Sequence, residues 1–175
     1  MKNKKSLFKI TYTAIFTAII LLSTMLVKFS TGMGEGYIHL GDCFIYLSAC
    51  ILPAPYCLIA GAVGGALADI LGGYAVWSLP TAIIKFLIAL PLMLACRKNK
   101  TQKMLSVKVA FMPVISGAIS ILGYFITECI LYSVASATLS LVGNTIQSVA
   151  SGILFLIFAS ALDKMNFKSK LFKGV

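Results

Sequence analysis

The sequence predicts an all-α integral membrane protein with six transmembrane helices in a compact bundle. Composition supports this class, because the 175-residue chain is 59% hydrophobic and has a mean hydropathy of +0.97. Soluble domains contain only about 45–50% apolar residues. Long apolar segments also alternate with short connections, and the lysines fall in three clusters between them. At this length we expect a single membrane domain over residues 1–175.

Six apolar segments define the expected helices. A transmembrane helix needs roughly 17–25 residues, so we expect the two short segments to tilt or to end before one membrane surface. Pro53 and Pro55 separate the second segment from the third, and proline cannot continue a helix, so these two form a tight helical hairpin. The expected helices cover residues of about 10–27, 42–52, 56–71, 80–96, 107–132 and 141–162.

Positive charge predicts the orientation of the chain. Basic residues mark the cytoplasmic loops of membrane proteins, and with six spans the clusters at residues 2–9, 97–108 and 164–173 all fall on one side. Both termini are therefore expected to be cytoplasmic, in a multi-pass protein of the bacterial plasma membrane. The net charge of +10 is explained by topology and by contact with anionic membrane lipids. A nucleic-acid partner is not expected, because the basic residues form no surface interleaved with exposed aromatics.

Most of the polar residues inside apolar sequence fall in the outer half of the membrane under this topology. Ionisable side chains are costly there and tend to mark function. Helix ends and outer loops would gather them around one outward-facing pocket, suited to a small, neutral or zwitterionic molecule rich in hydrogen-bonding groups. The candidate substrate-binding residues are His39, Asp42, Asp69, Tyr74, Trp77, Lys85, Glu128, Asn144 and Gln147.

The charged candidates also have structural interpretations. Asp42 lies at the start of the second helix, where a carboxylate caps free backbone N–H groups. Asp69 and Lys85 both lie near the outer ends of their helices, so they either form a buried ion pair with each other, or contact the ligand, or do both.

The outer connections carry two open alternatives. Tyr74 and Trp77 belong either to an interfacial aromatic belt or to a stacking wall for a flat ligand. The glycine-rich connection at residues 28–40 is either a lid over the site or a plain flexible link. The five cysteines form no CxxC pair, and we expect no disulfide framework, no metal site and no cofactor.

Several motifs together resemble one family of membrane proteins. These are IHLGD at residues 38–42, GAVGGALADILGGYAVW at 61–77, PTAIIK at 80–85 and GNTIQ at 143–147. They closely resemble the substrate-binding S components of energy-coupling factor (ECF) vitamin transporters, over nearly the whole chain. The AIFTA at residues 14–18 is similar to the AxxxA docking motif of that family. Taken alone, Ala14 and Ala18 only indicate a helix face that permits close packing.

The resemblance implies a function and a set of partners. The chain would bind a water-soluble vitamin from outside under the first outer loop and dock through Ala14 and Ala18 on a transmembrane coupling subunit. It would then topple in the membrane while two ATPase subunits drive release. The motifs are most similar to the branch for riboflavin, hydroxymethylpyrimidine and pyridoxine. The compact site around Trp77 favours a single-ring ligand such as pyridoxine or hydroxymethylpyrimidine, with riboflavin as the alternative.

Two other classes of function fit the sequence less well. A membrane enzyme would use His39, Asp42, Asp69 and Glu128 as acid–base groups, but the chain has no nucleophile–base spacing and no H-E-x-x-H metal pattern. A self-sufficient secondary transporter commonly has internal repeats, and none is evident here. The chain also lacks a phosphate-binding G-x-x-x-x-G-K-[ST] loop, so it is not expected to be an ATPase. We expect it not to be an enzyme of another class either, since it lacks the patterns named above.

Overall fold

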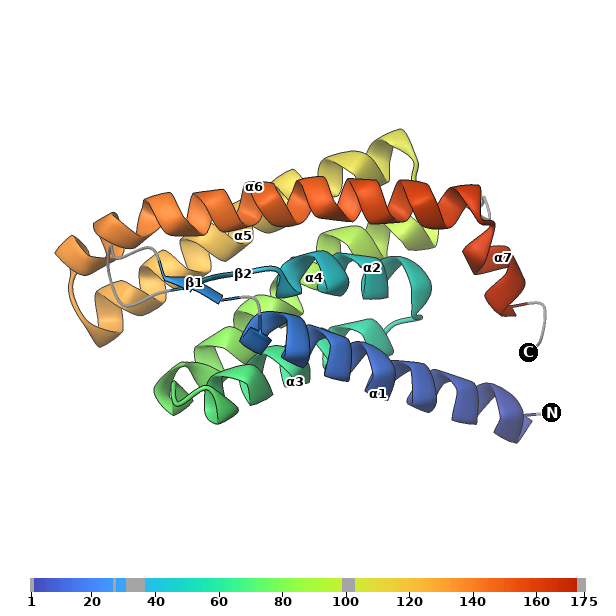
Figure 1. Cartoon of the computed structure of the whole chain (residues 1–175), viewed down its shortest axis with the longest axis horizontal. Coiled ribbons are helices and arrows are strands. Elements are labelled where there is room, and N and C mark those ends of the chain that lie inside the picture. Colours follow the sequence, from blue (N-terminus) through green and yellow to red (C-terminus); the bar gives the residue numbers. More distant parts are fainter. Residues whose placement is uncertain (1, 27, 31–36, 99–102, 173–175) are drawn as a thin grey trace.

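The computed structural model describes residues 2–26, 28–30, 37–98 and 103–172. Six main helices pack side by side and a short seventh follows near the C-terminus (Figure 1). The all-α class and the six main helices are therefore confirmed. The helices are α1 (Lys2–Leu26), α2 (Gly41–Ile51), α3 (Tyr56–Leu71), α4 (Ser78–Lys98), α5 (Val107–Leu131), α6 (Val134–Lys164) and α7 (Phe167–Phe172), with a 3₁₀ turn η1 (Ala75–Trp77) before α4.

Four of the helical segments in the described part of the chain are long and apolar enough to cross a membrane, and α2 and α3 are shorter. With 11 residues, α2 is about 16 Å long, roughly half the thickness of the hydrocarbon core. It contacts α1, α3, α4 and α6, and nearly all of its residues are buried. This short helix therefore forms part of the interior, so that a polar side chain on it is surrounded by the other helices.

Two helices begin earlier than the apolar segments predict. Helix α1 starts at Lys2, because lysine is a good helix former and the helix continues beyond the apolar segment into the basic one. Helix α6 starts at Val134, where the Ser133 side chain caps it by accepting a hydrogen bond of 3.2 Å from the Ser136 N–H. Hydropathy marks the membrane core, whereas these caps and propensities set the helix ends.

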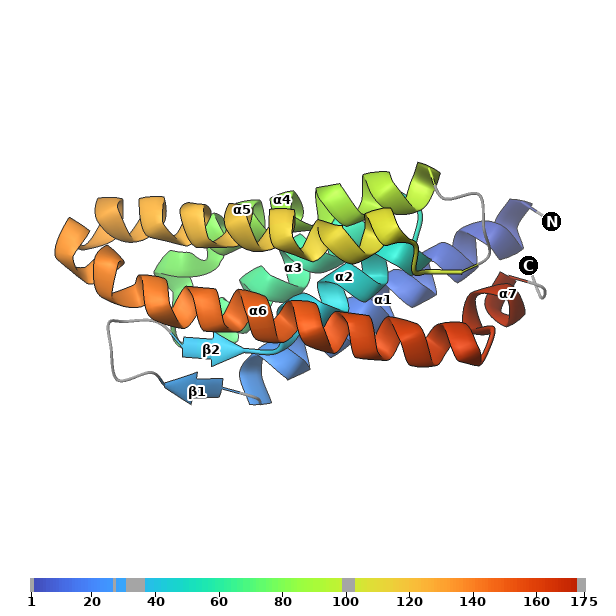
Figure 2. The same cartoon turned by 90° about the horizontal axis from the view of Figure 1, so that it is seen from above.

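A small β-hairpin connects α1 to α2. Strand β1 (Lys28–Ser30) pairs antiparallel with β2 (Tyr37–His39), so that Lys28 is opposite His39. The strands lie beside α6 (Figure 2), which β2 contacts. Sequence patterns did not predict this hairpin. Gly32, Gly34, Glu35 and Gly36 of the predicted lid lie outside the described residues.

Glycines on α3 bring two neighbouring helices close. A Cβ atom at Gly64 would lie 2.9 Å from Ile20 Cγ2 on α1, and one at Gly65 would lie 2.8 Å from Lys85 Cγ on α4. These distances are shorter than real carbon contacts, so only glycine permits this spacing. Helix α3 is thus held between α1 and α4, with its last turn beside the start of α4.

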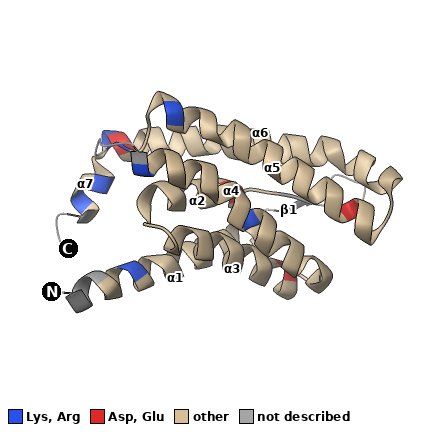
Figure 3. Ribbon diagram, turned by 180° about the vertical axis from the view of Figure 1, so that it is seen from behind, with Lys and Arg blue, Asp and Glu red and all other residues tan. Residues whose placement is uncertain are grey.

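The end of the bundle that carries both termini is also the basic end. Figure 3 shows most of the described Lys and Arg residues gathered there. Asp163, at the end of α6, accepts hydrogen bonds from the N–H groups of Met104 at 2.7 Å and Leu105 at 2.9 Å. It thereby fastens the segment before α5 to α6. The shared end agrees with the predicted orientation, in which the basic clusters and both termini face the cytoplasm.

Candidate functional site

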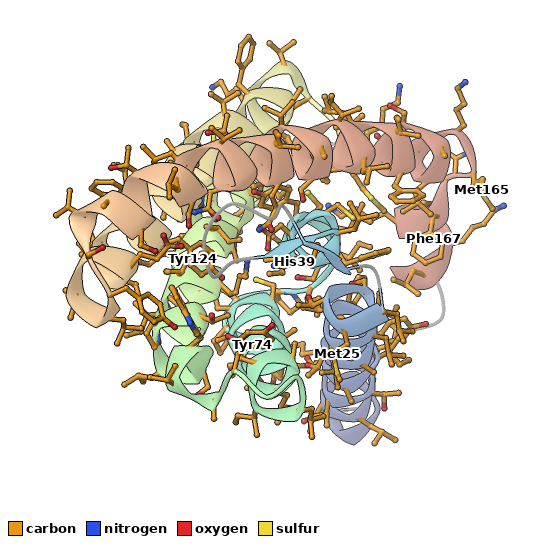
Figure 4. All side chains as sticks on the ribbon, turned by 60° about the vertical axis from the view of Figure 1, so that its left-hand side comes forward. Met25, His39, Tyr74, Tyr124, Met165 and Phe167 are labelled. Carbon is orange, nitrogen blue, oxygen red and sulfur yellow. The ribbon has the colours of Figure 1, made fainter. Side chains whose placement is uncertain are left out.

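A cavity of about 50 Å³ lies toward the other end of the bundle. We call it the polar cavity. Its walls come from α1, β2, α3, the turn before α4, α4, α5 and α6. Figure 4 shows how His39, Tyr74 and Tyr124 approach from separate segments. The lining residues are Thr24, His39, Asp69, Tyr74, Trp77, Thr81, Tyr124, Glu128, Asn144 and Gln147.

All the predicted substrate-binding residues line this cavity except Asp42 and Lys85. Those two form an ion pair in the interior, with Lys85 Nζ 2.6 Å from Asp42 Oδ1 and side chains only 1% and 0% exposed. The Lys85 ammonium also lies 5.1 Å from the centroid of the Tyr124 ring. Removing either partner would leave a buried charge without compensation, so this pair is a strong structural constraint.

The alternative in which Asp69 and Lys85 form an ion pair with each other is wrong. Lys85 pairs with Asp42 because α2 is enclosed by the other helices and presents its first turn to α4. Asp69 instead lies on the wall of the polar cavity. The interpretation of Asp42 as a helix cap is also wrong, since α2 has no side-chain cap and the Asp42 oxygens accept hydrogen bonds from Lys85 and Gln147.

Gln147 connects α6 to the junction between β2 and α2. Its Nε2 donates to Asp42 Oδ2 at 3.1 Å, and its Oε1 accepts from the His39 N–H at 3.2 Å. The His39 ring accepts at Nδ1 from the Gly41 N–H at 3.1 Å, and its Nε2 lies 3.5 Å from Lys85 Nζ. The Gln147 side chain therefore fixes the position of the β1–β2 hairpin relative to the ion pair between Asp42 and Lys85.

Aromatic rings form one side of the polar cavity. The Trp77 ring centroid lies 6.0 Å from that of Tyr124 and 5.9 Å from that of Tyr132, and Trp77 Nε1 donates to the Tyr132 hydroxyl at 3.2 Å. Trp77 is only 7% exposed, whereas Tyr74 is 38% exposed. A residue of an interfacial belt would face lipid or headgroups, so the burial of Trp77 favours the stacking wall.

Glu128 Oε2, an acceptor, and Asn144 Nδ2, a donor, lie on the cavity wall and have no hydrogen-bond partner among the described residues. Both atoms are buried, and a buried polar atom without a partner costs about 1–3 kcal/mol. A ligand that offers both a donor and an acceptor would satisfy both groups.

Three lining residues were missed at the level of sequence: Thr24, Thr81 and Tyr124. Tyr124 lies one turn before Glu128, and helical spacing already places the two on one face of the predicted helix. Thr81 lies one turn before Lys85, and its hydroxyl oxygen is 3.5 Å from that of Tyr124. Thr24 had no signal beyond being a polar residue near the end of an apolar helix. In the described part of the chain, no cluster of three or more His, Cys, Asp or Glu residues could hold a metal ion.

The two small residues of the candidate docking motif lie on the surface. Ala14 and Ala18 are exposed on α1, as are Ile15 and Leu22 on the same side of the helix. Helix α1 packs with its opposite side on α2 and α3. The exposed face is therefore available to another helix or to lipid.

Comparison with known proteins identifies similar chains. The family model for the S component of the ECF-type riboflavin transporter matches residues 4–164. Among solved structures, the crystal structure of an S component for biotin from an ECF-type ABC transporter superimposes with a TM-score of 0.63. It is 19% identical, and the alignment covers 94% of this chain and 95% of that one, a likeness of fold alone. No curated protein matches the sequence significantly.

Proposed function

Because the chain belongs to the family of S components of ECF-type riboflavin transporters, we propose that its polar cavity binds riboflavin. Membership makes the chain a substrate-binding subunit of a multi-pass membrane transporter, and S components are not enzymes. The family favours riboflavin over the single-ring vitamins expected from the sequence. Substrate and an ECF module are its implied partners.

The observation that carries the proposal is the pair of unsatisfied atoms, Glu128 Oε2 and Asn144 Nδ2, on a wall that also holds Trp77. The flavin ring is flat, and its pyrimidine-dione edge has one N–H donor between two carbonyl acceptors. The carboxylate would accept from the N–H, and the amide would donate to a carbonyl. The aromatic wall would contact the ring face, and the remaining polar lining would meet the ribityl hydroxyls.

A fluorescence titration tests the ligand. Trp77 is the only tryptophan, so riboflavin entering the polar cavity is expected to quench the emission of the purified protein. We expect riboflavin to bind at least about tenfold more tightly than pyridoxine, hydroxymethylpyrimidine or biotin, a difference of about 1.4 kcal/mol. If every compound leaves the emission unchanged, the site is elsewhere.

The single-ring vitamins are the second candidate. The near-complete burial of His39, Asp69, Glu128 and Gln147, at 3–5% exposure, favours a small ligand enclosed on most sides. The same titration decides between the candidates. If pyridoxine or hydroxymethylpyrimidine binds more tightly than riboflavin, that vitamin is the ligand of the polar cavity. Mass spectrometry of the compound that copurifies with the protein identifies the ligand independently.

We further propose that the exposed face of α1 around Ala14 and Ala18 docks on the transmembrane coupling subunit, which two ATPase subunits drive. Small residues let two helices approach closely, so Ala14→Trp is expected to lower recovery of the coupling and ATPase subunits at least tenfold in a pull-down. Riboflavin binding should stay unchanged, because Ala14 does not line the polar cavity.

Ile126→Trp is the matched control for this variant. Ile126 is 57% exposed on α5, so the substitution adds the same ring to another lipid-facing helix and should preserve assembly. Equal loss of vitamin binding in Ala14→Trp would instead show that this face of α1 supports the fold. Unchanged assembly would place the docking surface elsewhere.

A further inference from the structure

An apolar groove runs between α4 and α5 on the outside of the bundle, with a volume of about 580 Å³. We call it the lateral groove. Residues 87–95 of α4 and 108–119 of α5 supply its walls. Pro91 and Ala95 have small side chains, which leaves space between the larger residues Leu94, Met112 and Ile115. The groove is separate from the polar cavity, and the two share no lining residue.

The length of the groove matches one membrane leaflet. Along α5 it extends from Lys108 to Ile119, which is about 16 Å at a rise of 1.5 Å per residue. The hydrocarbon core of a bilayer is about 30 Å thick, so one leaflet contributes about 15 Å. Helix α5 begins at the end of the bundle that carries both termini. The groove therefore extends from that surface to about the membrane midplane.

Among the described residues, Lys108 is the one charged residue on the groove wall, and it lies in the first turn of α5, at the basic end. The described residues offer it no ion-pair partner. Asp163, the carboxylate at that end, is already engaged by the backbone N–H groups of Met104 and Leu105. Arg97 is exposed at the end of α4. The mouth of the groove is thus positive and its length is apolar.

We propose that the lateral groove binds one anionic phospholipid of the cytoplasmic leaflet. One acyl chain lies along α4 and α5, and the Lys108 ammonium contacts the headgroup phosphate. Basic sites between transmembrane helices on the cytoplasmic side recognise anionic headgroups in this way. Because α1 packs on α2 and α3 and not on the walls of the groove, a partner docked on the exposed face of α1 would leave the groove facing lipid. The inference is independent of which vitamin the polar cavity binds.

Native mass spectrometry of the purified full chain tests this proposal. The protein is equilibrated in micelles with equal amounts of phosphatidylglycerol and phosphatidylcholine. We expect one retained phosphatidylglycerol per chain, preferred about fivefold over phosphatidylcholine, the effect of one lysine near an anionic headgroup. Lys108→Gln should remove this preference. Lys164→Gln, which removes an exposed lysine at the same end but outside the groove, should preserve it.

A second variant tests the apolar part of the groove. Ile115 is 48% exposed, so Ile115→Trp fills the groove without disturbing the interior, and it should reduce retention of both lipids at least fivefold. Circular dichroism of each variant confirms that the helices are intact. Equal retention of both lipids by the wild type, an unchanged preference for phosphatidylglycerol in Lys108→Gln, or unreduced lipid retention in Ile115→Trp would overturn the proposal. A dimer of the chain without bound lipid would also overturn the proposal. Displacement of the lipid by an equal concentration of glycerol phosphate would do the same, because this compound has no acyl chain.

Discussion

Lys85→Met is expected to destabilise the folded protein by about 3–5 kcal/mol, because it leaves the Asp42 carboxylate buried without its charged partner. The wild-type pair is 2.6 Å apart with both side chains enclosed, so water cannot replace the ammonium. The Asp42 side chain would retain only the hydrogen bond from Gln147. Unfolding in mixed micelles with increasing sodium dodecyl sulfate, followed by circular dichroism, measures the loss.

The double variant Asp42→Asn with Lys85→Met provides the internal comparison. It removes both charges, so it should be more stable than Lys85→Met alone. Lys164→Met removes an exposed lysine and should change stability by less than about 0.5 kcal/mol. If Lys85→Met were as stable as the wild type but failed to bind vitamin, Lys85 would be a ligand-binding residue, and the structural role assigned to the pair would be wrong.

The sequence could place Lys85 near the outer end of its helix but could not identify its partner. Asp42 and Asp69 both lie near outer helix ends, and spacing along the chain does not distinguish them. The choice depends on α2, which is enclosed by four other helices. Its length and apolarity alone could equally describe a short helix at the membrane surface. Tertiary packing determined this pair, and no local pattern encodes it.

The membrane architecture was more predictable than its details. Apolar runs and lysine clusters reveal helices and orientation because the bilayer imposes length and charge rules on every span. Those rules also placed most of the cavity residues at one end, including Trp77, Glu128 and Asn144. The β1–β2 hairpin has strands of only three residues, too short for alternation to be recognised. The early start of α6 depends on the cap by Ser133, which hydropathy does not detect.

Asn144→Leu is expected to have opposite effects on riboflavin binding and on the stability of the empty protein. In the ligand-free protein, Asn144 Nδ2 is a buried donor without a partner among the described residues, so replacing the amide by an apolar group of similar size should be neutral or slightly stabilising. In the complex, the proposed hydrogen bond to a flavin carbonyl would be lost. Binding should then weaken by about 1–3 kcal/mol, roughly five- to 150-fold in Kd.

This difference in sign separates a ligand-binding residue from a structural one. A structural amide would lose stability when replaced and would affect binding only through the fold. Thr145→Ala is the matched control, because the neighbouring Thr145 hydroxyl donates only to the Leu141 carbonyl of its own helix, at 2.7 Å, and lies outside the polar cavity. Titration of Trp77 emission and unfolding in mixed micelles give the two quantities for each variant. If Asn144→Leu lowers the stability and leaves the Kd for riboflavin unchanged, Asn144 does not donate a hydrogen bond to the flavin. Its assignment as a donor to the vitamin would then be wrong.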